Sequence, residues 1–136
     1  MIRTFQKRDT DGVQQLWRRV FPDDPPWNAP EAVIRIKSRI QPELFFVYVE
    51  NDALLGTVIA GFDGVRGWIH KLAVTPEAQR TGIAAALMQE AESALLALGC
   101  PKVNLQVRAT NEQVIEFYRQ AGYHIEERIS MGKRLQ

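Results

Sequence analysis

Apolar residues along the chain follow two spacings, which separate the expected helices from the expected strands. One helical pattern, with offsets of 0, 3, 4 and 7, starts near Asp9 and consists of Val13, Leu16, Trp17 and Val20. The same offsets recur over residues 114–121, directly after Asn111. Pro30 suits the first turn of another helix, and a fourth, Ala-rich helix is expected over residues 82–98.

Aromatic and β-branched residues dominate the stretches expected to form strands. These are residues 2–5, 44–50, 53–62, 67–75, 102–108, 123–127 and 129–133. Asn51-Asp52 and Asp63-Gly64 are hairpin-turn signals between consecutive strands. The pattern predicts an α/β (α+β) domain, in which about four helices flank a single mixed, mostly antiparallel central sheet of six to seven strands.

Length and composition restrict the class of protein. A chain of 136 residues predicts one domain spanning 1–136. The net charge is +1 and no basic run has interleaved aromatic residues, so we expect no nucleic-acid partner. No apolar stretch reaches the roughly 18–20 residues of a membrane span, and the N-terminus lacks a signal-peptide core. Cys100 is the only cysteine, which suits a reducing compartment, and we predict a cytoplasmic protein.

The turn Gln79-Arg80-Thr81-Gly82 precedes the Ala-rich helix without an ordinary capping box. The first four N–H groups of a helix lack internal partners and lie in positive potential, so a phosphate can serve as the cap. Small residues at Gly82 and Ala84 allow close approach of a pyrophosphate, and Arg80 adds positive charge. A glycine turn is also common without a ligand. The chain has neither a Gly-Lys-Ser/Thr loop nor a Gly-x-Gly-x-x-Gly motif, which argues against Walker-type and dinucleotide-binding folds.

Two motifs resemble those of the GCN5-related N-acetyltransferase (GNAT) family. In the first, Leu72-Ala73-Val74 precedes the turn, and Gln79, Gly82 and Ala84 match the three fixed positions of the family signature. The second motif consists of Asn111, Phe117-Tyr118 and Gly122-Tyr123. The resemblance covers nearly the whole chain and is closest to small bacterial single-domain acetyltransferases of the YpeA type. It implies the GNAT-type acyl-CoA N-acyltransferase fold.

The resemblance also implies an acetyl-CoA-dependent N-acetyltransferase. Such an enzyme moves the acetyl group from acetyl-CoA, its co-substrate, to a primary amine by direct attack in a ternary complex, and we expect no metal. It assigns cofactor binding to Leu72, Ala73, Val74, Gln79, Arg80, Thr81, Gly82, Ile83, Ala84 and Asn111. The pantetheine arm would lie between the strand at residues 72–74 and the strand that begins near Lys102. Asn111 either contacts the cofactor, as the resemblance implies, or only caps its helix, for which Asn is well suited.

Tyr118 and His70 are the candidate catalytic residues. The family's tyrosine at the Tyr118 position is the usual general acid, and a phenol with pKa near 10 stays protonated at neutral pH. The alternative is a core tyrosine with a satisfied hydroxyl. His70 lies two residues before Leu72, so we expect both on the same strand face. Its imidazole is either a base, a proton relay or a structural group, and water is the alternative base.

The loop at residues 23–28 corresponds to one wall of the family's acceptor site. Asp23 and Asp24 could attract an ammonium group, and Trp27 could stack on a substrate; the alternative is a solvated loop with one packed aromatic. The expected partner is a small-molecule or peptide amine, and the chain is expected to be a monomer or a homodimer. The alternative function is a non-catalytic acyl-CoA-binding sensor or interaction domain.

Overall fold

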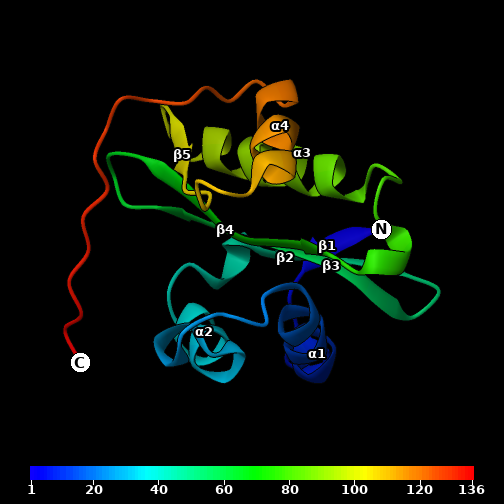
Figure 1. Cartoon of the computed structure of the whole chain (residues 1–136). Helices are drawn as coiled ribbons and strands as arrows, with labels where there is room; N and C mark the ends of the chain where they lie inside the picture. Colours follow the sequence, from blue (N-terminus) through cyan, green and yellow to red (C-terminus); the bar gives the residue numbers. More distant parts are fainter. The chain divides into compact units, whose positions relative to one another are not determined.

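The computed structural model describes all residues, 1–136, in two compact units. The first unit, Met1–Gln106, contains a five-stranded sheet and three α-helices, and the second, Val107–Gln136, contains one helix (Figure 1). The four helices confirm the number expected from the apolar spacing. The sheet confirms the mixed α/β class with fewer strands than expected.

The sheet has the strand order β1-β2-β3-β4-β5. Its strands are β1 (Ile2–Thr4), β2 (Phe45–Glu50), β3 (Ala53–Phe62), β4 (Gly67–Val74) and β5 (Val103–Leu105). The first four strands pair antiparallel, and β5 is parallel to β4. Asn51 and Asp52 join β2 to β3 with φ values of 51° and 63°, which confirms the expected tight hairpin turn.

Helices cover both faces of this sheet (Figure 1). They are α1 (Thr10–Val20), α2 (Pro30–Lys37) and α3 (Ile83–Ala97), and short 3-10 turns lie at η1 (Lys7–Asp9), η2 (Pro26–Asn28), η3 (Pro42–Leu44) and η4 (Pro76–Ala78). The buried face of α1 and residue Ile34 of α2 pack on β2, β3 and β4. On the other face α3 lies so close that a Cβ at Gly56 would be 2.9 Å from the Leu87 side chain. The same Cβ would lie 3.0 Å from the Ala73 carbonyl oxygen, so glycine avoids a tight contact with the neighbouring strand as well as with the helix.

A buried hydrogen-bonded path links α1 to β3 and β4. The Trp17 indole N–H donates to the Thr57 hydroxyl over 2.9 Å, and this hydroxyl donates to the Lys71 carbonyl over 2.8 Å. Thr57 is fully buried and Trp17 is almost fully buried. Because every polar group on the path has a partner, the path fixes the position of α1 over β4 at little desolvation cost.

The second unit contains α4 (Glu112–Gln120). Asn111 caps it, accepting at its side-chain oxygen from the Val114 amide over 3.3 Å, and Gly122 follows it with φ of 96°. The predicted strands at 123–127 and 129–133 are wrong, because residues 123–136 contain no strand. The sheet therefore has five strands rather than six or seven, and β5 is shorter than the expected 102–108.

Alternation is the reason for the wrong prediction in the last segment. Ile125, Ile129, Met131 and Leu135 occupy odd positions, as in a strand with one apolar face, yet all four are largely exposed. Alternation with a period of two residues indicates which side chains would share a face. A strand forms, however, only where a neighbouring strand accepts its backbone hydrogen bonds. The sequence pattern contains no information on that neighbour.

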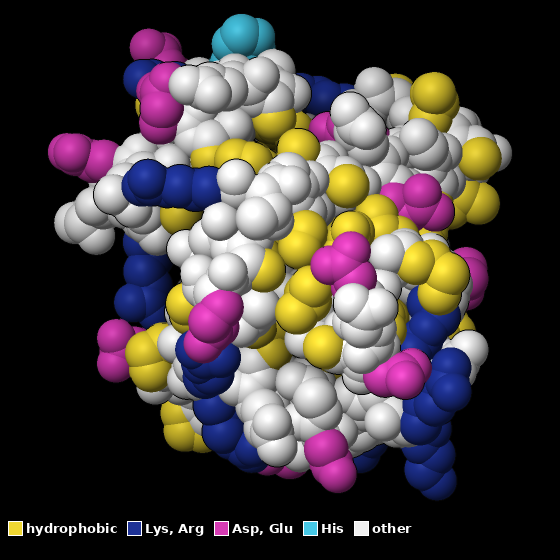
Figure 2. Space-filling model, turned by 90° about the vertical axis from the view of Figure 1, so that its right-hand side faces the viewer, with side chains coloured by type: hydrophobic (Ala, Val, Ile, Leu, Met, Phe, Trp, Pro, Cys, Tyr) yellow, Lys and Arg dark blue, Asp and Glu magenta, His cyan; other side chains and the backbone are white.

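Charges of both signs are distributed over the surface. The chain has 17 basic and 16 acidic residues, and Figure 2 shows them interspersed on one face without a large area of one sign. None of the helices is both long enough and apolar enough to cross a bilayer.

Asp9, at the end of η1, is expected to contribute to stability through a bidentate pair with Arg3. Both guanidinium contacts are 2.8 Å, and the Gln6 amide donates to the same carboxylate over 2.8 Å. The Arg3 hydrogen bonds lower the pKa of Asp9, although burial opposes them. Asp9→Asn should therefore lower the free energy of unfolding by about 1 kcal/mol at pH 7, after allowance for solvent screening.

The pH dependence of that loss provides the check. Because the pKa of Asp9 is lower in the folded state, its carboxylate stabilises the fold at pH values above its unfolded-state pKa near 3.9. This stabilisation is lost as the pH falls through the folded-state pKa. In urea unfolding, the free energies of unfolding of wild type and Asp9→Asn should differ at pH 7 and converge as the pH falls below 3.9. An equal difference at pH 7 and pH 3 would contradict the assignment.

Candidate active site

The turn before α3 has the geometry of an anion site. Gly82 is the N-cap, with φ of 89° and no side-chain hydrogen bond to the helix, and a Cβ built on it would meet nothing within 4 Å. The first helical hydrogen bond runs from the Ala86 amide to the Gly82 carbonyl, 3.0 Å, so the preceding amides lack intrahelical acceptors. Arg80 also has positive φ, 64°, a strained conformation of the kind found at ligand sites.

A charged network anchors the chain just before this turn, and sequence reasoning did not find it. Arg19 of α1 donates to the Thr75 hydroxyl over 3.1 Å and to the Glu77 carboxylate over 2.7 Å. Thr75 donates to the same carboxylate over 2.6 Å. The hydrogen bonds from Arg19 and then Thr75 lower the pKa of Glu77 to about 2, so the network is ionised at neutral pH. Arg19 lies on the polar side of α1, where a charged residue carries no signal of a distant partner.

The last residues of β4 pair with β3 on one edge and have no strand partner on the other. Pairing between β4 and β5 ends at Ile69 with Leu105, so Leu72, Ala73 and Val74 extend beyond the parallel ladder. The Gln79 side-chain amide donates to the Val74 carbonyl over 3.2 Å, which connects the turn to the strand end. This open edge is compatible with the gap that the resemblance implies for a pantetheine arm.

A β-bulge in β4 changes the expected place of His70. Thr57 pairs with Ala73 but Ile59 pairs with His70, so β4 has one extra residue opposite β3, and Lys71 has positive φ, 55°. His70 therefore lies on the same face as Ala73, and the prediction that it shares a face with Leu72 is wrong. Strict alternation holds only in a regular strand, and the bulge interrupts it.

The surroundings of His70 favour the neutral imidazole. Partial desolvation lowers the pKa of His70, and the positive charges of Lys37 and Lys71 lower it further, although the residue as a whole is exposed and solvent screens these effects. The ring is then unprotonated at neutral pH and can accept a proton.

Tyr118 lies on α4 in an aromatic cluster of the second unit. Its ring makes edge contacts with Phe117 and Tyr123, with centroids 5.3 Å and 5.7 Å away. The residue is 9% exposed, and burial raises the pKa of its phenol to about 12. Tyr118 is thus buried and also remains protonated throughout the neutral range.

The loop after α1 places the two acceptor-site candidates differently. Asp24 lines a cavity of about 330 Å³ and forms an ion pair with Lys71, whose side chain is 10% exposed. Trp27 is not among the residues that line this cavity, and it is 54% exposed. The Lys71 Nζ atom also lies 4.7 Å from the Phe21 ring centroid and 5.4 Å from that of Trp17. Sequence reasoning missed Lys71, because only the bulge turns its side chain towards α1.

Comparison with known proteins gives these features a family. A family model described as the Acetyltransferase (GNAT) family matches residues 10–123. The chain belongs to the GNAT acetyltransferase family. A curated relative, the acetyltransferase YE1169 of Yersinia enterocolitica, is 41% identical over 134 residues, which are 98% of this chain and 94% of the relative. This GNAT chain is therefore an enzyme, an acetyltransferase, with bacterial relatives.

Solved structures share the GNAT fold at lower identity. Ard1 from Thermoplasma volcanium has a TM-score of 0.83 and 24% identity, over 93% of this chain and 83% of that one. The PaiA N-acetyltransferase from Thermoplasma acidophilum, solved in complex with coenzyme A, has a TM-score of 0.74 and 20% identity, over 95% and 92%. At these identities the likeness shows the fold. In the GNAT chain no group of three or more His, Cys, Asp or Glu side chains is placed to hold a metal ion.

Proposed function

We propose that this acetyltransferase moves the acetyl group from acetyl-CoA to a primary amine by direct attack in a ternary complex. The observation that carries the proposal is the positive-φ turn at Gly82, which opens α3 without a side-chain cap beside the end of β4, where the edge facing β5 has no strand partner. A pyrophosphate satisfies the free amides and the helix dipole together. The coenzyme A complex of the related PaiA enzyme supports the same co-substrate.

The binding residues divide into two groups in this proposal. The backbone of Leu72, Ala73 and Val74 binds the pantetheine arm at the open edge of β4. The pyrophosphate lies on the turn formed by Gln79, Arg80, Thr81, Gly82, Ile83 and Ala84. Asn111 caps α4 in any case, and a contact with the cofactor is proposed in addition. A single domain over residues 1–136 is part of the proposal, and the match of the GNAT model to residues 10–123 supports it.

Tyr118 and His70 have complementary roles in the reaction. The amine nitrogen attacks the thioester carbonyl, the carbon–sulfur bond breaks, and the thiolate leaves. Tyr118, protonated with pKa about 12, donates a hydrogen bond to the sulfur as negative charge develops there. A thiol with pKa near 8.5 can leave as the thiolate without full proton transfer from the weakly acidic phenol of Tyr118. The proton that the amine nitrogen loses needs a separate acceptor. His70 in its neutral form accepts that proton.

The pH profile of thiol release from acetyl-CoA tests this proposal. Below its pKa of about 10, the unprotonated fraction of an alkylamine acceptor rises tenfold with each pH unit. A plot of log kcat/KM against pH should therefore rise with slope 1. Below the lowered pKa of His70 the slope should become 2, because imidazole and amine must both be unprotonated. His70→Gln should reduce kcat/KM at pH 7 about 100-fold and keep slope 1 throughout. A slope of 2 that persists in His70→Gln would exclude His70 as the base.

A further inference from the structure

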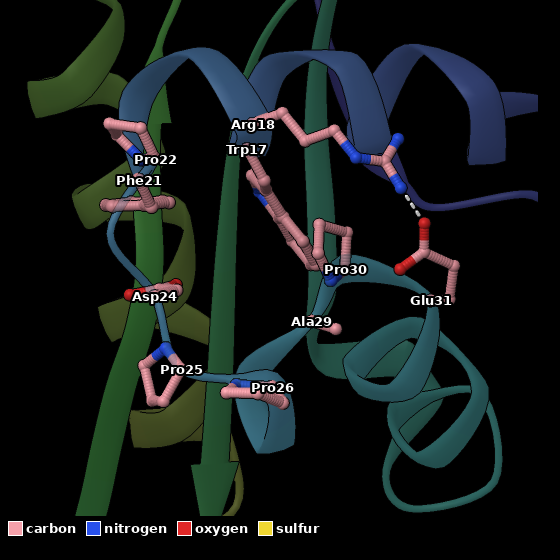
Figure 3. A pocket seen from close by; sticks show the side chains of 10 residues that line it. All are labelled: Trp17, Arg18, Phe21, Pro22, Asp24, Pro25, Pro26, Ala29, Pro30 and Glu31. Atoms are coloured by element: carbon pink, nitrogen blue, oxygen red, sulfur yellow. Dashed lines mark ion pairs between the residues drawn. The ribbon is translucent and has the colours of Figure 1, made fainter.

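The cavity beside the loop after α1 is the site from which the class of acceptor can be inferred. It has a volume of about 330 Å³. Figure 3 shows its lining side chains coming from the end of α1, the following loop and the start of α2. Seven of the ten lining residues are apolar: Trp17, Phe21, Pro22, Pro25, Pro26, Ala29 and Pro30.

The three charged residues of the lining already have partners within the protein. Arg18 forms an ion pair with Glu31 across the cavity rim (Figure 3), and Asp24 forms one with Lys71. Counting Lys71, the four formal charges sum to zero. A cation of the protein thus already neutralises each carboxylate, which weakens the attraction of the cavity for an additional positive charge.

Lys71 also occupies the aromatic faces that could bind a cation. Its ammonium lies 4.7 Å from the Phe21 centroid and 5.4 Å from the Trp17 centroid, within the range of a cation–π contact. The protein's own ammonium thus occupies both the carboxylate and the rings that a cationic substrate would use. An uncharged group, in contrast, gains apolar contacts with the proline and aromatic walls.

The ion pair between Asp24 and Lys71 links the cavity to the proposed acetyl-transfer site. Lys71 directly precedes Leu72 on β4, the first of the three residues whose backbone is proposed to bind the pantetheine arm. We propose that the cavity binds the uncharged, apolar arm of the acceptor, so that the enzyme prefers amines with an apolar chain or ring over diamines and polycations. This inference rests on the proposed function and specifies its substrate class.

Two amines with the same number of heavy atoms test the inference: 3-methylbutylamine ends in a branched apolar group, and 1,4-diaminobutane ends in a second ammonium group. Wild type should have at least tenfold higher kcat/KM for 3-methylbutylamine. Ala29→Phe fills the cavity and should remove that preference while the Kd for acetyl-CoA changes less than twofold. Ala53→Phe, at an exposed alanine of the β2–β3 hairpin, is the matched control and should behave as wild type. Equal or better use of the diamine by wild type would overturn the proposal.

Lys71→Met provides an independent test of the same inference. The substitution removes the Lys71 positive charge beside Asp24, so the preference should shift at least tenfold towards 1,4-diaminobutane. Thermal unfolding establishes that each variant is folded.

Direct binding separates this proposal from the proposed function. If no amine supports thiol release, each is titrated into protein saturated with coenzyme A. Binding of 3-methylbutylamine that Ala29→Phe abolishes would support the cavity although acetyl transfer had failed. Absence of binding by this amine, or binding that Ala29→Phe leaves intact, would overturn it.

Discussion

Tyr118→Phe is expected to lower kcat by roughly 10²–10³ at saturating acetyl-CoA and leave the Kd for acetyl-CoA within twofold. The substitution removes only the hydroxyl, so the ring contacts with Phe117 and Tyr123 persist. The hydroxyl acts only as the thiolate leaves, and its loss therefore affects the transition state rather than cofactor binding. Steady-state thiol release and calorimetry measure the two quantities.

Tyr123→Phe is the matched control, because it removes another phenol hydroxyl from the same aromatic cluster. It should leave kcat within about twofold. An unchanged kcat in Tyr118→Phe would contradict the role of the hydroxyl. Wild type that binds acetyl-CoA but turns over no acceptor amine would instead favour the alternative function, a non-catalytic acyl-CoA sensor.

Gly82→Asp is expected to weaken acetyl-CoA binding at least 100-fold, about 2.7 kcal/mol at 25 °C. An aspartate at the N-cap offers its own carboxylate to the free amides of α3 and places negative charge where the pyrophosphate is proposed to bind. Calorimetric titration with acetyl-CoA measures the change. A loss of less than threefold would show that the turn does not hold the pyrophosphate.

Gly99→Asp controls for backbone strain. Gly99 follows α3 with φ of 84°, close to the 89° of Gly82, and neither position has an atom within 4 Å of an added Cβ. Both variants therefore impose the same left-handed conformation on a residue with a side chain. Gly99→Asp should lower thermal stability at least as much as Gly82→Asp, because a negative charge is unfavourable at the C-terminal end of α3 and favourable at its N-terminal end, and it should retain wild-type affinity for acetyl-CoA.

The parts of the fold that depend on neighbouring residues were predictable from the sequence. The apolar spacing of α1, the Asn51-Asp52 turn and the Asn111 cap each result from interactions within a few residues, and the structure contains all three. The uncapped turn at Gly82 belongs with them, because a positive φ and a missing cap are local properties.

The parts that depend on distant partners were not predictable. The bulge that turns Lys71 towards α1 arises from the pairing of β3 with β4, and it reverses the expected face of His70. Asp24 resembled a free carboxylate in the sequence, but Lys71 neutralises it from 47 residues away. The final apolar alternation indicated strands for which residues 123–136 provide no ladder. Each error concerns a contact between segments, which a one-dimensional pattern does not encode.

Calorimetric titration of the wild-type protein with acetyl-CoA, with NAD and ATP as controls, tests the central claim most directly. The claim is that α3 begins on an uncapped glycine turn because the pyrophosphate of acetyl-CoA caps it. We predict a Kd on the order of micromolar for acetyl-CoA and binding at least tenfold weaker for NAD and ATP. Absence of heat with acetyl-CoA, in protein that mass spectrometry shows to be free of bound nucleotide, would contradict the account.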